Sequence, residues 1–427
     1  MPGIGTPMTQ LTNARIAARI STKKTIHLNT AQSPWPYNES VVYTPLVLVV
    51  LAGLLGPLLG AGKRLRVPVL VGELVGGIIL GRTGLHLIDP GAQPFPVFAS
   101  LGFAMLMFES GTAIDLGSRL LRDTAVRAGL AFLVTLLLAV PAGLLIGAGV
   151  GSGHAALFVV LLAGSSAAVA LPTIREQGLT GPAVSLVIAW IALADPITAL
   201  LMPLMLTSAG QIPAALVGDG LIIVAAALTI LVGRRLFGIG PAQEARQLSK
   251  QRHWALRLRI SVLLLLVLAA IAEHTGASLL VAGFAAGIVL RQFREPRRRL
   301  ELELTGLATG FFVPAFFVLL GAALDLKGLV SSPSAMALAI GMAVAATVVH
   351  LVASLAVGRQ RRLPAGLLAS AQLGLPAAAA ALGLATKLLR PPIAAALVAG
   401  GLLTLIPAIS GAILLSRAAP AGSPELT

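Results

Sequence analysis

One carboxylate, Asp195, stands near the middle of an apolar run from Pro182 to Leu206 that contains no Lys or Arg. A medium of low dielectric constant disfavours the charged form of a carboxylate, so such a group readily takes up a proton or a cation. Two ligands that compete for one carboxylate are what an ion-for-proton exchange requires. The simpler alternative is a protonated Asp195 that hydrogen-bonds a neighbouring helix.

Three further ionisable side chains fall inside apolar runs. His350 lies deep in the run 335–358, and an imidazole titrates near neutral pH. It can serve as a pH-responsive charge partner or only hydrogen-bond a carbonyl. Glu73 and Glu109 lie near one end of their runs, where they can form a funnel that attracts cations or can bridge helices.

The composition shows what must position these groups. Apolar residues make up 57% of the 427 residues, charged residues only 11%, and the mean hydropathy is +0.93, whereas a soluble domain has about a quarter charged residues. We therefore predict an all-α, polytopic membrane protein, because lipid requires each backbone amide to be satisfied within its own segment. About thirteen spans are expected, at 41–61, 67–81, 95–115, 125–150, 154–174, 182–206, 212–232, 254–274, 277–290, 304–324, 335–358, 363–385 and 392–415.

The basic residues predict the orientation of these spans. The net charge is +15, and most Lys and Arg fall in alternate loops between the spans, which excludes a nucleic-acid-binding patch. This pattern places the N-terminus outside and the C-terminus in the cytoplasm of a cell-membrane protein. Residues 1–40 lack the apolar stretch of a signal peptide and are expected to be a disordered tail, or a start assigned too early, and residues 418–427 a C-terminal tail.

The two halves of the chain share short segments. Gly77, Gly111 and Gly164 and the residues around them resemble those around Gly287, Gly321 and Gly374, and the positions differ by 210 each time. The sequence therefore predicts a first six-helix repeat at 41–206, a connecting helix and loop at 207–253, and a second repeat at 254–417. Seven spans separate equivalent helices, so the repeats cross the membrane in opposite directions, as in secondary transporters.

Paired interruptions in the two repeats indicate where a site would lie. One predicted span contains Gly164, Ser165, Ser166 and Pro172, and its counterpart contains Gly374 and Pro376. A broken helix exposes free carbonyls and helix ends to which an ion can bind. The alternative is close packing of small residues between helices.

At these residues the sequence resembles the monovalent cation:proton antiporters, the sodium/proton exchanger superfamily. The similar segments are 72–81, 108–115, 165–178 and 311–321, and the resemblance covers nearly the whole chain after Val41. It implies a homodimer with a mobile core domain, crossed broken helices and an elevator-type motion, with no cofactor. It also implies that Asp195 binds the transported cation or proton, and that Ser165 and Ser166 stand in the unwound helix.

Two departures from the family pattern matter. Asp195 follows Ala194, where the family has a second Asp or an Asn, and His350 stands where many members have Lys or Arg. A single carboxylate predicts one proton exchanged for one monovalent cation, sodium or potassium. Three alternatives stay open: a sodium-coupled organic-anion symporter, a non-transporting regulator and, least favoured because no HExxH motif occurs, a membrane enzyme.

Overall fold

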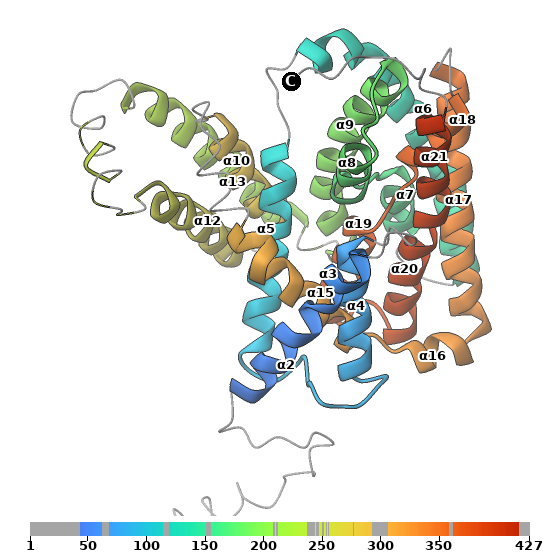
Figure 1. The fold of residues 1–427 in the computed structure, drawn as a ribbon, viewed down its shortest axis with the longest axis horizontal. Coiled ribbons are helices and arrows are strands. Elements are labelled where there is room, and N and C mark those ends of the chain that lie inside the picture. The colour runs from blue at the N-terminus through green and yellow to red at the C-terminus, as the bar shows by residue number, and fades with distance from the viewer. Residues whose placement is uncertain are drawn as a thin grey trace, which may run out of the picture. The chain divides into compact units, whose positions relative to one another are not determined.

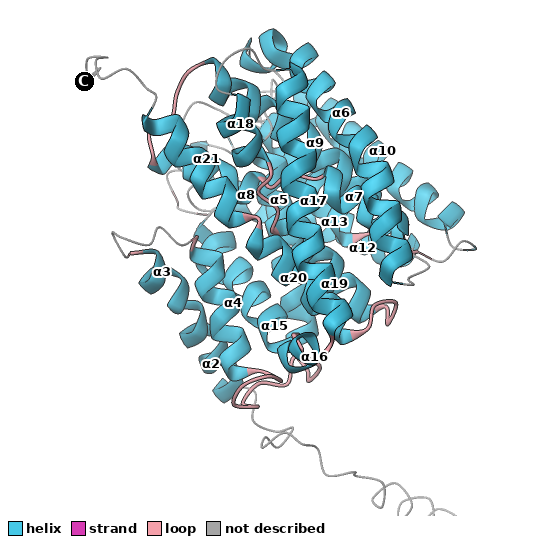
Figure 2. Cartoon of the chain, turned by 90° about the vertical axis from the view of Figure 1, so that its right-hand side faces the viewer, coloured by secondary structure: helices cyan, strands magenta, loops and turns pink. Residues whose placement is uncertain are grey.

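The computed structural model describes residues 43–61, 68–113, 119–150, 155–207, 210, 212–236, 244, 247–249, 252, 254, 256–275, 277–292, 306–357 and 362–417. Throughout these residues the regular structure is helical, and none of them forms a strand (Figures 1 and 2). The expected tails at 1–40 and 418–427, and Asp115 of the resembling segment 108–115, lie outside the described residues.

The helices of the first half, with the connecting helix, are α2 (Tyr43–Gly53), α3 (Leu55–Gly60), α4 (Val69–Leu80), α5 (Phe95–Ala113), α6 (Arg119–Val150), α7 (Ala155–Ala163), α8 (Ala167–Glu176), α9 (Pro182–Met205) and α10 (Ile212–Leu236). Those of the second half are α12 (Leu256–Thr275), α13 (Leu279–Gln292), η2 (Ala308–Phe312), α15 (Val313–Ala323), α16 (Leu326–Ser331), α17 (Pro333–Val357), α18 (Arg362–Ala369), α19 (Gly374–Ala385), α20 (Pro391–Leu403) and α21 (Leu405–Arg417).

Most of the predicted spans correspond to long apolar helices. Among the described residues, nine helical stretches are long and apolar enough to cross a membrane, and three shorter apolar helices are Val69–Leu80, Leu279–Gln292 and Ala308–Ala323. The predicted span 154–174 corresponds to the short helices α7 and α8. The number thirteen itself stays a prediction.

The two halves pack against each other through equivalent helix pairs. Helix α4 packs along α15, and α5 packs along α13. In the repeat, α4 corresponds to α13 and α5 corresponds to α15, so each contact joins one helix of the first half to one of the second. Glycine makes these contacts possible: a Cβ on Gly77 would collide with the backbone of Val318, and one on Gly321 with the backbone of Leu74. The same close approach occurs between Gly111 and Phe284. The fold is thus the inverted-repeat architecture that the sequence predicts.

A second group of helices surrounds the interrupted segments. Helix α6 packs on α7, α9 and α17, and α17 also packs on α18 and α20. Figure 1 shows α6, α17 and α18 together on one side, while α10, α12 and α13, which contact one another, lie on the other. Buried side chains from both groups, the one that contains α6, α9 and α17 and the one that contains α5 and α13, join in one continuous apolar core.

The interruptions are shorter than the sequence suggested. Residues 164–166 separate α7 from α8, and residues 370–373 separate α18 from α19. Gly164 lies at the first interruption and Gly374 begins the helix after the second. Pro172 and Pro376 were expected at the breaks, but both lie inside the helices that follow. Pro376 occupies the first turn of α19, where a missing N–H leaves no helical bond unmade.

A tight turn brings α9 back along α8. Gly178 and Gly181 adopt positive φ angles of 60° and 104°, which suit glycine, and Pro182 begins α9 with a φ angle fixed by its ring. Because the two helices run antiparallel from this turn, Ala167 at the start of α8 meets Asp195 in the middle of α9.

Candidate functional site

The two unwound segments are joined by hydrogen bonds. The Ser166 N–H donates to the carbonyl oxygen of Ala371 over 2.8 Å, and the Ser165 hydroxyl donates to the carbonyl of Ala369, the last residue of α18, also over 2.8 Å. Each segment thus satisfies backbone groups that the interruption of the other leaves without helical partners. The interruptions meet each other, and both serine side chains are buried.

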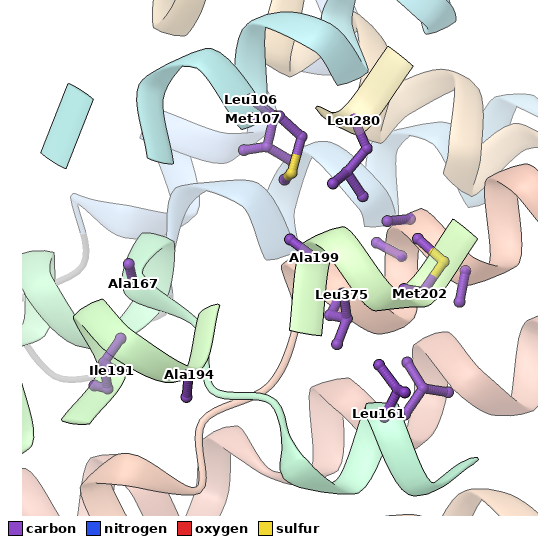
Figure 3. Close-up of a cluster of buried hydrophobic side chains, with 14 of the residues drawn as sticks. Leu106, Met107, Leu161, Ala167, Ile191, Ala194, Ala199, Met202, Leu280 and Leu375 are labelled. Atoms are coloured by element: carbon purple, nitrogen blue, oxygen red, sulfur yellow. The ribbon is translucent and has the colours of Figure 1, made fainter. Parts of the chain in front are cut away.

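The side chain of Asp195, on α9, lies beside the N-terminal end of α8. The backbone N–H of Ala167 points to Asp195 Oδ2 at 3.3 Å, and a helix N-terminus favours negative charge. In Figure 3, Ala167, Ile191 and Ala194 lie near the place where the unwound segments pass each other. The Asp195 carboxylate therefore stands beside the end of an interrupted helix.

The exposed part of the half-buried Asp195 side chain borders a small cavity. Its volume is about 30 Å³, enough for one or two water-sized particles. It lies between helices α5, α8 and α9, and its lining residues are Ser110, Ala167, Leu171, Ile188, Ile191, Ala192, Asp195 and Pro196. One carboxylate thus stands in an otherwise mostly apolar chamber, where its electrostatic attraction for a cation or a proton is strong.

The residue after Asp195 leaves one backbone oxygen of α9 without its usual helical donor. Pro196 has no N–H, so it cannot donate the helical hydrogen bond to the carbonyl of Ala192, four residues earlier. Both residues line the cavity. The Thr198 hydroxyl bonds the carbonyls of Ala194 at 2.8 Å and Asp195 at 3.2 Å, which stabilises the helix beside this proline.

His350 is fully buried on α17 and reaches the first interruption. Its Nδ1 lies 2.8 Å from the carbonyl oxygen of Ala346 and its Nε2 3.1 Å from Ser165 Oγ. The ring of Trp190, on α9, stacks on the imidazole at a centroid distance of 5.4 Å. His350 is therefore connected to Ser165, but it does not line the Asp195 cavity.

The hydrogen bonds of His350 are compatible with two protonation states of its ring. Nδ1 must carry a hydrogen because a carbonyl can only accept. If Ser165 donates to Ala369, Nε2 must also carry a hydrogen, and the ring is the imidazolium. If the ring is neutral, the Ser165 hydroxyl has to leave Ala369 to donate to Nε2. The protonation of His350 is thus coupled to a contact between the two broken helices.

The remaining predicted site residues lie at different distances from the cavity. Ser165 and Ser166 do not line it, since Ser165 contacts His350 and Ala369. Glu109 is adjacent to the lining residue Ser110 and interacts electrostatically with Arg175 of α8. Glu73 is buried in α4 against Gly56 of α3 and does not line the cavity. No group of three or more His, Cys, Asp or Glu in the described ranges is placed to hold a metal ion.

The sequence reasoning missed Gln372, which lies in the second interruption. Its side chain is buried and its Nε2 donates to the carbonyls of Gly164 at 2.8 Å and Leu162 at 3.3 Å. A polar residue in an otherwise apolar predicted span, near a predicted break, was the available signal. Ser110 was also not proposed, although it lies next to Glu109.

Comparison with known proteins assigns the chain to a family. A family model described as the transmembrane region of sodium/hydrogen exchangers matches residues 47–416. The chain belongs to this family. The matched range includes α7, α8, α9 and α17–α19, and so contains Asp195, His350 and both interruptions.

Two bacterial relatives have related sequences. The chain is 27% identical over 304 residues to the putative Na⁺/H⁺ antiporter YjbQ of Bacillus subtilis, covering 66% of this chain and 47% of that protein. It is 28% identical over 307 residues to the Na⁺/H⁺ antiporter NhaS5 of Synechocystis, covering 69% of this chain and 41% of that protein. The chain therefore spans less than half the length of either relative.

Solved structures show the same fold. Two structures of the sodium proton antiporter MjNhaP1 from Methanocaldococcus jannaschii match with TM-scores of 0.59 and 0.60, at 17% and 16% sequence identity. The first match covers 88% of this chain and 96% of the other, and the second covers 90% and 100%. At such identities the likeness concerns the fold alone.

Proposed function

We propose that this protein is a secondary active transporter that exchanges a monovalent cation, sodium or potassium, for a proton. The observation that carries the proposal is the Asp195 carboxylate, which borders a cavity at the N-terminal end of a broken helix. Family membership and the antiporter relatives support the same conclusion.

The cavity offers oxygen ligands suited to a cation. Asp195 supplies the charge, the Ala192 carbonyl has no helical N–H from Pro196, and Ser110 of α5 also lines the cavity. Carboxylate, carbonyl and hydroxyl oxygens are the donors that hard cations prefer. A proton on Asp195 removes the charge that holds the cation, so the two ligands compete. The small volume does not favour an organic anion as substrate.

The repeat counterparts of the site support exchange of one charge for one charge. Asp195 corresponds to Leu405 in the second repeat, and Ala194 corresponds to Thr404. Among the residues that the structure describes, Asp195 is the one carboxylate that lines the cavity. One proton would therefore replace one monovalent cation, and transport would be insensitive to membrane potential.

His350 acts in this proposal as a pH-responsive charge partner. Its protonation determines whether Ser165 donates to Ala369. Ser165 lies two residues before Ala167, and the backbone N–H of Ala167 contacts Asp195. A change at His350 can therefore reach the ion site through the first interruption. Glu109 and Glu73 are proposed to attract cations to the cytoplasmic side, with Glu109 nearer the cavity.

Alternating access is proposed to follow the elevator scheme. Ser110 belongs to α5, which packs along α13, whereas Asp195 belongs to α9, which packs along α6. The cavity thus lies between helices of the two groups, and displacement of one group past the other would expose it on the opposite side. The family resemblance also favours a homodimer. The paired glycines favour repeats bounded at 41–206 and 254–417, and the distribution of Lys and Arg favours an outside N-terminus in the cell membrane.

Proteoliposomes that contain a pH-sensitive dye test the function. Addition of each alkali cation should drive proton efflux with the wild-type protein, and Asp195→Asn should abolish it. Asp219→Asn, which changes a buried carboxylate on α10 away from the cavity, is the matched control and should retain exchange. Exchange that persists in a folded Asp195→Asn variant, or that an imposed membrane potential drives without a pH gradient, would contradict the proposal.

A further inference from the structure

Gln372 occupies the second interruption in a fixed backbone position. Its backbone N–H donates to Thr404 Oγ1 at 2.9 Å, and the same hydroxyl lies 3.2 Å from its carbonyl oxygen. Its neighbour Ala371 accepts the hydrogen bond from Ser166. The base of the Gln372 side chain is thus held between the end of α20 and the first interruption.

The amide of Gln372 is matched to the C-terminal end of α7. Its nitrogen lies 2.8 Å from the carbonyl oxygen of Gly164 and 3.3 Å from that of Leu162. Both partners are acceptors, so the amide must present its NH₂ group, whose two hydrogens serve the two carbonyls. These are carbonyls at the end of a helix, which have no partner farther along the helix.

Carbonyls at a helix end within a membrane protein carry partial negative charge and attract a cation. The neutral amide of Gln372 occupies the Gly164 and Leu162 carbonyls with hydrogen-bond donors. A cation near the interruption is thereby directed to the Asp195 side, where the cavity lies. The same two bonds fix Gly164, three residues before the Ala167 N–H that meets Asp195.

We infer that Gln372 is a positioning residue for ion exchange, which holds the end of α7 so that Ala167 meets Asp195 and keeps cations from the α7 carbonyls. This inference rests on the proposed function. It makes a prediction that general destabilisation does not make. The loss of the Ala167 hydrogen bond disfavours the ionised Asp195, so protons should compete with the cation up to higher pH.

The test compares Gln372→Met, which keeps the shape of the side chain and removes both donors, with Gln372→Glu. In Gln372→Met the KM for the cation should rise about tenfold, the usual effect of losing a hydrogen bond to a charged group, with a smaller change in maximal rate. The activity curve should move to higher pH. Gln372→Glu can donate one hydrogen when protonated, so its defect should diminish on acidification, unlike that of Gln372→Met.

Gln292→Met, at a half-buried position at the end of α13 where the side chain accepts a hydrogen bond from Arg234, removes a glutamine outside both interruptions; it is the control and should exchange as wild type does. An unchanged KM and pH profile in folded Gln372→Met would overturn the inference, as would a loss of rate alone. If Gln372→Met does not fold, Gln372→Glu decides by the presence or absence of rescue at low pH. Thermal stabilisation of the purified protein by sodium and by potassium measures binding independently of transport. If the cations stabilise the wild-type protein but no exchange occurs, the proposed exchange is refuted, and the role of Gln372 is then judged from cation binding in the variants. If the cations neither stabilise the protein nor exchange for protons, the proposed function and the role of Gln372 are both refuted.

Discussion

At the scale of single residues, the site separates two tasks that titratable groups can perform. Asp195 borders the cavity and offers its charge to a ligand, whereas His350 is sealed in the core and contacts only neighbouring protein groups. A group that cannot reach the cavity acts on the ion through its hydrogen-bond partners. Ser165 is the partner that connects His350 to the interruption preceding α8.

The stacking of Trp190 on His350 provides a direct measure of this histidine. The chain has three tryptophans, so replacement of Trp35 and Trp254 by Phe leaves Trp190 as the only one. An imidazolium quenches the fluorescence of a stacked indole more than a neutral imidazole does. Emission should therefore fall as the pH is lowered through the titration of His350, and His350→Phe should abolish that step. The His350→Phe variant should also shift the pH profile of exchange. A quenching step that survives in the variant would assign it to another group, and an unshifted exchange profile would assign His350 to packing.

At the scale of elements, the helix pairs that join the two repeats depend on glycine. The backbone of Val318 on α15 lies where a Cβ on Gly77 of α4 would be, and backbone cannot yield as a flexible side chain can. These contacts let the two helices approach closely along their length, which is how helices associate in lipid. The pairs α4–α15 and α5–α13 thus connect the halves of the molecule.

A methyl group at Gly77 tests this dependence. Gly77→Ala should destabilise the protein by about 1–3 kcal/mol, the usual effect of overpacking a close contact. Gly341→Ala is the matched control: it lies in α17 with no atom near the added methyl group, and alanine favours the helix. Thermal unfolding in detergent should show a lower Tm for the first and an equal or higher Tm for the second. Equal Tm values for Gly77→Ala and wild type would show that the helices can separate without loss.

The elements also show what the sequence could and could not predict. The spans, the repeats and the interruption at Gly164 follow from apolar runs and paired glycines, which are local patterns. The exact extent of the breaks does not, because α8 continues through Pro172. Asp195 could be identified because a charge in an apolar run is conspicuous. The contacts that Gln372 makes with Gly164 and that Ser165 makes with His350 could not be predicted, because residues far apart in sequence meet only where the unwound segments cross.

At the scale of the whole molecule, the predicted orientation determines the side on which the cavity opens. The distribution of Lys and Arg places the loop after α8 in the cytoplasm, and the cavity residue Leu171 lies on α8 beyond the interruption. Lys387, in the turn between α19 and α20, belongs to a loop predicted to lie outside. The two positions should therefore be reached from opposite sides of the membrane.

The chain has no cysteine, so single cysteines can report on each side without background. A membrane-impermeant thiol reagent should label Leu171→Cys in inside-out vesicles and Lys387→Cys in right-side-out vesicles. Sodium or potassium should slow the labelling of Leu171→Cys, because the cation would occupy the cavity that this residue lines, and should leave Lys387→Cys unaffected. Asp195→Asn should remove the protection by cations but not the sidedness of labelling. Labelling of Leu171→Cys from the outside alone would reverse the orientation, whereas protection that persists in Asp195→Asn would place the cation at another group.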